Sequence, residues 1–167
     1  MPRAIKLVAA RERPDASCID TVILTSDQRR AAKGEVVGVK GTPIVIDLAV
    51  APAMRTDDAL VLEDGRLVAV VAAAEPLCEV RVADLSALAR LAWHLGDRHI
   101  AVEVLPNRLR ARRTPEVESL LAALGAKVAA IEAPFEPEGG AYAVSHDHDA
   151  HDHEHDHHDH HHDHRRK

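Results

Sequence analysis

The amino-acid sequence predicts an α+β protein with three regions: a small β-rich domain over residues 1–74, a domain of alternating strands and helices over residues 77–140, and a disordered tail over residues 141–167. Three observations predict this organisation. Short runs rich in valine, isoleucine and leucine fill the first half. Strand and helix patterns alternate in the second half. The last 23 residues, SHDHDAHDHEHDHHDHHHDHRRK, carry eleven of the thirteen histidines and no periodic apolar residues that could offset the entropy of ordering them.

Five runs of strand length build the β-rich half. They occupy residues 3–9, 20–25, 34–39, 42–50 and 59–73. Asp64-Gly65 divides the last run, and this dipeptide between apolar runs is a strong signal for a tight β-hairpin. Without the tail, about 140 residues remain for folded structure, which is enough for one ordinary domain or two small ones.

The boundary between the two folded regions is predicted at Glu75-Pro76. A residue that precedes proline avoids the helical region, so this dipeptide is expected to form a linker. The pattern that follows is strand 77–83, helix 84–97, strand 99–105, strand 108–112, helix 114–125 and strand 127–133. The order strand–helix–strand–strand–helix–strand is that of the ferredoxin-like βαββαβ fold.

Both predicted helices carry recognisable end signals. Asp84 is suitably placed to cap the first helix. Thr114 caps the second helix, Pro115 occupies its first turn and Gly125 ends it. The apolar face of the first helix is expected to contain Leu85, Leu88, Ala89, Ala92 and Leu95.

Charge and composition argue against a nucleic-acid partner. The net charge is −6, and the acids of the tail account for most of it, which leaves −2 on the body. The whole chain contains one Trp, one Tyr and one Phe. Such a body offers neither a basic patch nor an aromatic stacking platform for nucleic acid.

The cysteines and the N-terminus indicate a reducing, cytoplasmic location. Cys18 and Cys78 stand far apart without a Cys-x-x-Cys pair, so they form neither a disulfide framework nor a zinc-finger pattern. The first residues contain no apolar core long enough for a signal peptide. No run approaches the length of a membrane span, so no membrane partner is expected.

The histidines of the tail predict binding of transition metals. Neutral imidazole is a common ligand for Ni(II), Zn(II) and Cu(II), and many imidazoles on one segment recapture a released ion. Interleaved acids favour a natural segment over an affinity tag, and a merely solvating tail has no need of histidine. Protons compete for the ligands, so metal loading should fall as pH drops through about 6.5. The predicted ligands are His146, His148, His151, His153, His155, His157, His158, His160, His161, His162 and His164.

The body contains only two further histidines, His94 and His99. Helical phase places His94 on the exposed face of the first helix. His99 follows the helix end, where Gly96 can break the helix and the next strand begins. From spacing alone, each histidine could be an ordinary surface residue or a metal ligand.

Two short motifs resemble those of the UreE-type urease accessory proteins, which are nickel metallochaperones. WHLGDRH, residues 93–99, resembles the His-Leu-Gly-Asn-Arg-His signature of that family. FEPEGGAY, residues 135–142, resembles its Phe-Glu-Pro-Glu-x-Gly-Ala-Tyr segment, which stands directly ahead of the His-rich tail. Looser matches in the β-rich half are VILTSDQRR, PIVIDL and RTDDALVLEDGRLVAVVAAAE, so the resemblance spans nearly the whole chain.

The resemblance implies a homodimer formed through the second domain, with nickel bound at the two-fold axis. It implies that the ligand is His99 of each subunit. His146 and His148 follow FEPEGGAYAVS closely enough to supply further ligands, and His94 is expected to be peripheral at best. The partners that it implies are the urease apoprotein and the urease accessory GTPase complex. The chain departs from the family in two ways: Asp97 replaces the Asn of the motif, and RLRARRTP lacks the histidine pair that some members carry.

Other functions remain open on the residues alone. A general transition-metal buffer or storage protein for zinc, copper or nickel fits the tail equally well. A metalloenzyme is disfavoured, because the body offers two histidines and no His-x-x-Glu-His-like pairing, so no enzymatic activity is expected. The basic stretch RLRARR is either a solvated strand face or a contact for an acidic partner.

Overall fold

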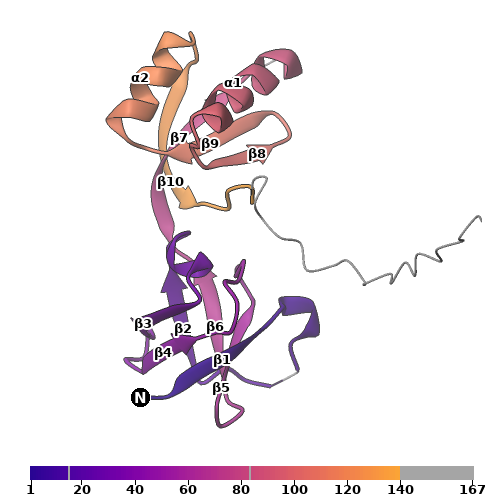
Figure 1. Ribbon diagram of the computed structural model, residues 1–167, viewed down its shortest axis with the longest axis vertical. Coiled ribbons are helices and arrows are strands. Elements are labelled where there is room, and N and C mark those ends of the chain that lie inside the picture. Colours follow the sequence, from indigo (N-terminus) through magenta and orange to yellow (C-terminus); the bar gives the residue numbers. More distant parts are fainter. Residues whose placement is uncertain (15, 83, 140–167) are drawn as a thin grey trace, which may run out of the picture.

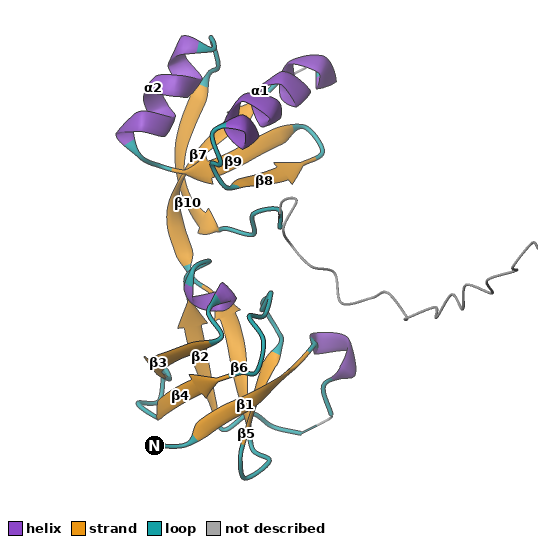
Figure 2. Ribbon diagram, in the orientation of Figure 1, coloured by secondary structure: helices purple, strands orange, loops and turns teal. Residues whose placement is uncertain are grey.

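The computed structural model describes residues 1–14, 16–82 and 84–139, so the predicted tail and its eleven histidines lie outside the described residues. Within the described residues the chain forms two β-sheets and two α-helices, and the α+β class is confirmed. The first sheet is built by the N-terminal half of the chain and the second by the C-terminal half, as Figures 1 and 2 show.

The N-terminal half forms a six-stranded sheet. Its strands are β1 (Arg3–Val8), β2 (Asp20–Leu24), β3 (Lys33–Val37), β4 (Pro43–Asp47), β5 (Ala59–Leu62) and β6 (Leu67–Ala72). Their order in the sheet is β2-β6-β5-β1-β4-β3, with β1/β4 and β2/β6 parallel and the other pairs antiparallel. The predicted hairpin joins β5 to β6, and its Gly65 has a φ of 83°. The buried core of the N-terminal half contains Ala4, Val22, Leu24, Ile44, Ile46, Leu48, Met54, Leu60, Leu62, Val68 and Val70.

A buried carboxylate fixes the loop between β3 and β4. Asp20 is 1% exposed, and its oxygens accept hydrogen bonds from the amides of Lys40 at 2.9 Å and Thr42 at 3.2 Å. Hydrogen bonds from the Thr42 side chain and the Lys40 amide hold the pKa of Asp20 well below its usual range. A Cβ at Gly38 would lie 2.2 Å from this carboxylate, so only glycine fits there.

The C-terminal half forms a four-stranded antiparallel sheet. Its elements are β7 (Ala74–Arg81), α1 (Leu85–Asp97), β8 (Val102–Leu105), β9 (Arg108–Arg112), α2 (Pro115–Ala123) and β10 (Val128–Pro134), in the predicted order of strands and helices. The sheet order is β10-β7-β9-β8, and both helices cover the same face (Figure 2). Between helices and sheet lies a second core, made of Cys78, Val80, Leu88, Leu91, Leu95, Val102, Leu109, Ala111, Val117 and Leu121.

The helix ends follow the sequence signals, but the buried face of α1 does not. Asp84 accepts a hydrogen bond from the Ser86 amide at 2.9 Å, and Thr114 accepts one from the Val117 amide at 3.3 Å. These two predicted caps are confirmed. The expected apolar face was wrong at Leu85 and Ala89, which are exposed because the helix turns Leu88, Leu91 and Leu95 toward the sheet.

The predicted linker at Glu75-Pro76 was also wrong. Both residues lie inside β7, where Glu75 pairs with Ala133 and Pro76 pairs with Glu132 of β10. The residue before proline avoids a helix but is comfortable in a strand. Pro76 lies beyond the register with β9, which begins at Leu77, so the missing N–H of proline interrupts no bond on that side.

Candidate functional site

His99 occupies the turn that ends α1. Its amide donates to the Gly96 carbonyl at 2.9 Å, and the Ile100 amide donates to the Leu95 carbonyl at 3.0 Å. This pair of bonds is a Schellman motif, which requires a left-handed residue at the position of His99. The φ of His99 is 55°, and its side chain is exposed. The predicted end of the helix at Asp97 is confirmed, with Gly96 inside the last turn of α1 and the reversal three residues later at His99.

The turn that ends α2 has the same geometry with a glycine in place of the histidine. Gly125 donates to the Ala122 carbonyl at 2.9 Å, Ala126 donates to the Leu121 carbonyl at 3.0 Å, and the φ of Gly125 is 72°. Glycine is the residue that such turns favour, because a Cβ in the left-handed region costs about 1 kcal/mol. A residue kept at that cost is a reason to look for a function of its side chain.

Asp57 is the other non-glycine residue with a positive φ in the part of the chain that the structure describes. Aspartate adopts this conformation readily, because its short carboxylate can bond to nearby backbone groups. His99 is therefore the positive-φ residue whose side chain is an imidazole, the commonest side-chain ligand of transition metals.

His94 lies away from that turn, in a different environment. It is half-buried on α1 and its ring meets the Trp93 ring edge to face, with centroids 5.0 Å apart. It lines a pocket of about 260 Å³ between α1 and the Gly125 turn, together with Arg90 and Leu124. The structure thus assigns His94 to a helix–turn groove and His99 to the end of α1, and it records no contact between the two imidazoles.

An apolar stripe runs along the exposed side of α1 toward His99. Leu85 is 70% exposed and Trp93 is 64% exposed, and Ala89 lies between them on the same side. The spacing of four residues keeps the three side chains on one face of the helix. This stripe, Leu85-Ala89-Trp93, is hereafter called the α1 stripe.

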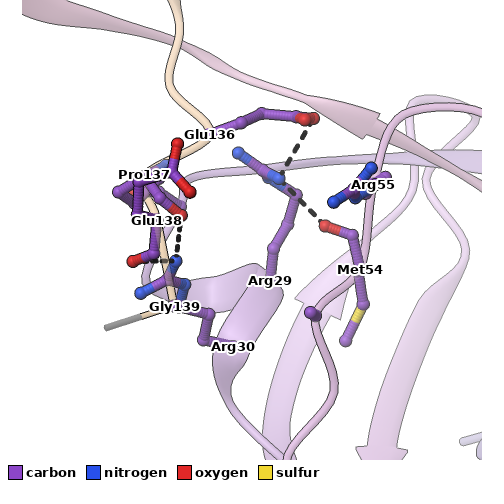
Figure 3. Close-up of a pocket in the computed structure, with 10 residues that line it drawn as sticks. Arg29, Arg30, Met54, Arg55, Glu136, Pro137, Glu138 and Gly139 are labelled. Atoms are coloured by element: carbon purple, nitrogen blue, oxygen red, sulfur yellow. Dashed lines mark hydrogen bonds and ion pairs between the residues drawn. The ribbon is translucent and has the colours of Figure 1, made fainter. Parts of the chain in front are cut away.

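The segment that precedes the tail is bound at both of its sides. The Glu138 amide donates to the Val102 carbonyl at 2.8 Å, so the segment lies along β8, three residues after His99. On the other side, Arg29 and Arg30 of the N-terminal half bond to the same segment (Figure 3). Residues 135–138 are therefore held beside β8, the strand that follows His99 in the chain.

A pocket of about 290 Å³ lies where the two halves meet around this segment. Arg29, Arg30 and Arg55 line it from the N-terminal half, and Glu136 and Glu138 line it from the C-terminal half (Figure 3). Sequence reasoning assigned no role to Arg29, Arg30 or Glu138. These residues were marked only by their place in VILTSDQRR and FEPEGGAY, the two segments that resemble the UreE family. Their contacts join residues more than a hundred positions apart, and such contacts leave no periodic pattern in the sequence.

Two arginines of the basic stretch RLRARR, Arg108 and Arg110, pair with a carboxylate of their own sheet. Glu79 is buried on the sheet face away from the helices, and it pairs with Arg81 at 2.8 Å and Arg110 at 2.9 Å. Burial raises the pKa of Glu79, but the hydrogen bonds from Arg110 and Arg81 outweigh it and hold the pKa below its usual value. Arg108 lies 3.9 Å from the same carboxylate. Arg108 and Arg110 are therefore half-buried partners of Glu79 rather than a fully solvated strand face.

Most of the predicted metal ligands belong to the tail. His146 and the ten later histidines lie outside the described residues. Among residues 1–14, 16–82 and 84–139, no three His, Cys, Asp or Glu side chains converge in a metal-binding group. In that same part of the chain, neither helix is long and apolar enough to cross a membrane.

Comparison with known proteins identifies the class of the chain. Residues 4–73 match the family described as "UreE urease accessory protein, N-terminal domain", and residues 75–164 match "UreE urease accessory protein, C-terminal domain". These matches place the chain among the urease accessory proteins. Within that class, the chain belongs to the UreE family.

Individual relatives support the same assignment along most of the chain. The "Urease accessory protein UreE" of Bradyrhizobium sp. (strain BTAi1 / ATCC BAA-1182) is 52% identical over 91% of this chain and 75% of its own length. That of Rhodopseudomonas palustris (strain BisB18) is 51% identical over 84% of this chain and 69% of its own. That of Chelativorans sp. (strain BNC1) is 40% identical over 90% of this chain and 92% of its own.

Proposed function

We propose that this protein is a nickel metallochaperone, which captures Ni(II) and delivers it to the urease apoprotein together with the urease accessory GTPase complex. The observation that carries the proposal is His99, an imidazole kept in a left-handed turn that glycine occupies in α2. A metal ligand is a physical reason for keeping it there. Membership of the UreE family supports the connection to urease.

In this proposal, a homodimer supplies the second imidazole ligand that a single chain lacks. A single exposed histidine holds a transition metal weakly, whereas a two-fold interface presents the same histidine twice. The α1 stripe supports such an interface, because two large apolar side chains in water on one helix face gain free energy when a second copy covers them. His99 stands at the end of that helix, so paired helices would bring two imidazoles to one axis.

The tail supplies the remaining ligands in this proposal. His146 lies eight positions after Glu138, and eight extended residues span at most about 28 Å. Val102, to which Glu138 is bonded, lies only three positions after His99. His146 and His148 are therefore within reach of the axis, and the later histidines would collect further ions. Histidines on a separate segment can leave the nickel ion one at a time, which suits transfer of the ion to another protein.

The finer structural assignments belong to the same proposal. The strand order β10-β7-β9-β8 and the order of elements support a ferredoxin-like C-terminal domain from residue 77 to 140, after an N-terminal domain over 1–74. A cytoplasmic, non-enzymatic role is consistent with these features and remains a proposal.

A general buffer or store for zinc, copper or nickel is the second candidate function. The composition of the tail favours it, because by the Irving–Williams order the same histidines hold Cu(II) at least as well as Ni(II). Such a protein needs no defined site at an interface, whereas a delivery protein does. The strained conformation of His99 therefore favours delivery.

Reconstitution distinguishes the two functions. Nickel-loaded wild-type protein and a His99→Gly variant are compared for activation of apo-urease in the presence of the other accessory factors. A delivery role requires that the variant activate much less urease at equal total nickel. Equal activation by both proteins would reject a delivery role for His99, because nickel released from the unchanged tail would then account for the activation, as expected of a buffer.

A further inference from the structure

We propose that Arg81, Arg108 and Lys127 form a cationic row on the C-terminal sheet, which binds an acidic segment of a partner protein. The inference goes beyond the proposed nickel site and does not depend on it. All three residues belong to the part of the chain that the structure describes.

The row lies on the face of the four-stranded sheet that α1 and α2 do not cover (Figure 2). Val80 of β7 and Leu109 of β9 belong to the core beneath the helices. Because side chains alternate along a strand, their neighbours Arg81 and Arg108 point to the opposite face. Arg81 and Arg108 are also direct partners in the register of β7 with β9. Two guanidinium groups therefore stand opposite each other on that face.

Lys127 extends the row onto a third strand. It immediately precedes β10, whose first residue, Val128, pairs with Val80 of β7. Continuing that antiparallel register by one residue brings Lys127 opposite Arg81, and residues directly opposite each other share a face of the sheet. Lys127 is exposed. The strands β10, β7 and β9 are neighbours in the sheet, so the row crosses three adjacent strands.

The carboxylates of this face do not balance its cations. Glu79 accepts from Arg81 at 2.8 Å through Oε1 and from Arg110 at 2.9 Å through Oε2. Arg108 lies 3.9 Å from the same Oε2, which is too far for a hydrogen bond. Glu103 lies 3.6 Å from Arg110. In these ion pairs three arginines share two carboxylates, so one positive charge is left over even before the lysine is counted.

Arg108 is the member of the row that lacks an acceptor. Its Nε is buried and has no hydrogen-bond partner among the described residues, whereas its side chain as a whole is 31% exposed. Like charges placed directly opposite each other on two strands destabilise a sheet. A carboxylate bound between Arg81 and Arg108 would accept from both guanidinium groups and would offset their repulsion.

The chemistry of the row favours an acidic protein segment over nucleic acid. A carboxylate matches the planar fork of donors that a guanidinium presents. Nucleic acid that is bound as a single strand also needs aromatic rings on which its bases can stack. Trp93 lies on α1 and Phe135 is buried, so neither ring is available on this face.

The position of the row leaves room for a partner. The end of β9 that is joined to the N-terminal half is Arg112, which bonds to Asp27. Arg108 is four residues, or about 13 Å, further along the strand. The α1 stripe belongs to a helix on the other side of the sheet. A partner on the row would therefore leave the proposed dimer contact uncovered.

The test is fluorescence anisotropy of a labelled peptide in which pairs of glutamates alternate with single glycines, titrated with the metal-free full chain. We expect saturable binding that weakens as salt is added. Arg81→Gln, Arg108→Gln and Lys127→Gln should each raise the dissociation constant, and any two combined should raise it at least about threefold. Absence of saturable binding, or wild-type affinity in all of these variants, would overturn the inference.

Matched controls separate the row from net charge. Arg11→Gln removes the same charge from the N-terminal half, where Arg11 is exposed and pairs with one acidic neighbour, Glu12, as Arg81 pairs with Glu79. Affinity should stay at the wild-type level in this control, and an equal loss would show that only net charge matters. A thymidine oligonucleotide that binds more tightly than the peptide, and weakens in the same variants, would contradict an acidic partner.

Thermal unfolding separates binding from a role in the fold. Arg108→Gln removes a contact between like charges, so its unfolding midpoint should equal or exceed that of the wild type. Arg110→Gln withdraws a donor from buried Glu79 and should lower the midpoint. An equal fall in Arg108→Gln would assign Arg108 to the fold and overturn the inference. His99→Gly should leave peptide binding unchanged, so failure of the row and failure of the nickel site are distinguishable.

Discussion

Histidine and glycine occupy equivalent positions at the ends of α1 and α2, and the comparison isolates what the imidazole of His99 contributes. The backbone bonds of the two turns agree in pattern and in length. The φ values are 55° for His99 and 72° for Gly125, so both residues are left-handed. The side chain is thus the main local difference, and it works against the stability of the α1 turn.

His99→Gly should therefore stabilise the protein and remove its tight nickel site. We expect the free energy of unfolding of the metal-free protein to rise by as much as about 1 kcal/mol, because glycine adopts the left-handed region without the Cβ penalty. Calorimetric titration should show that the tight class of nickel sites is lost while weaker tail binding remains. A variant with wild-type titration behaviour would show that His99 is not a ligand.

Gly125→Ala is the matched control at the equivalent turn of α2. It should lower the free energy of unfolding by about 1 kcal/mol, because it places a Cβ in the left-handed region. Nickel binding should stay at the wild-type level. The two variants together separate strain in a helix-ending turn from loss of a ligand.

At the scale of single elements, α1 has two apolar sides with different partners. Leu88, Leu91 and Leu95 pack against the sheet, whereas the α1 stripe faces water in the single chain. The same helix thus combines a core face with a second apolar face that ends near His99. In the proposed homodimer, the second face forms the contact.

Trp93→Glu should weaken the dimer without weakening the fold. Trp93 is 64% exposed, so the fold gains little from its burial, while a carboxylate placed in a closing apolar interface must lose water. We expect the dimer dissociation constant, measured by sedimentation equilibrium, to rise at least about tenfold, which corresponds to about 1.4 kcal/mol. Val50→Glu, at an exposed position of the N-terminal half, is the control. An unchanged dissociation constant for Trp93→Glu would exclude the α1 stripe from the interface.

Capping and turn residues predicted the helices and the hairpin correctly, but they gave no information on contacts between distant parts of the chain. Asp84, Thr114 and the Asp64-Gly65 hairpin were identified correctly, because each acts on residues within a few positions of itself. The side of α1 that contains Leu85 was misassigned, because apolar residues lie on both faces and periodicity alone does not say which one meets the sheet.

The same distinction explains what the sequence could predict of the candidate site. His99 was identified through the resemblance of its motif, but its left-handed turn was not, since no glycine marks it. The contact of Arg29 with the Phe135 carbonyl joins residues 106 positions apart and could not be inferred from either segment alone. Binding by the tail histidines remains a prediction.

At the scale of the whole molecule, the carboxylates that stabilise the fold have pKa values well below the pKa of histidine. Hydrogen bonds from Thr42 and Lys40 lower the pKa of Asp20, and a hydrogen bond from Arg112 lowers that of Asp27. A carboxylate with a lowered pKa adds stability that is fully present above its ordinary pKa near about 4 and is lost only as pH falls through the lowered value. The fold should therefore persist at pH values where histidines are already protonated.

Nickel release and acid unfolding should consequently occur in two separate pH ranges. We expect bound nickel, measured by equilibrium dialysis, to fall between about pH 7 and pH 5, as protons displace the ion from imidazole. The circular dichroism signal should stay constant over that range and change only below about pH 4. A nickel load that stays constant down to pH 5 contradicts ligation by histidine, and unfolding that coincides with release contradicts the assigned role of the carboxylates.

Native mass spectrometry of the chain ending at Ser145, loaded with Ni(II), tests the central claim most directly, because no tail histidine is left to mask the shared site. The account predicts one nickel ion for every two chains, carried by a dimer, and none in the same chain with His99→Gly. One ion bound to each single chain, or a protein that stays monomeric at micromolar concentration with nickel in excess, would contradict it.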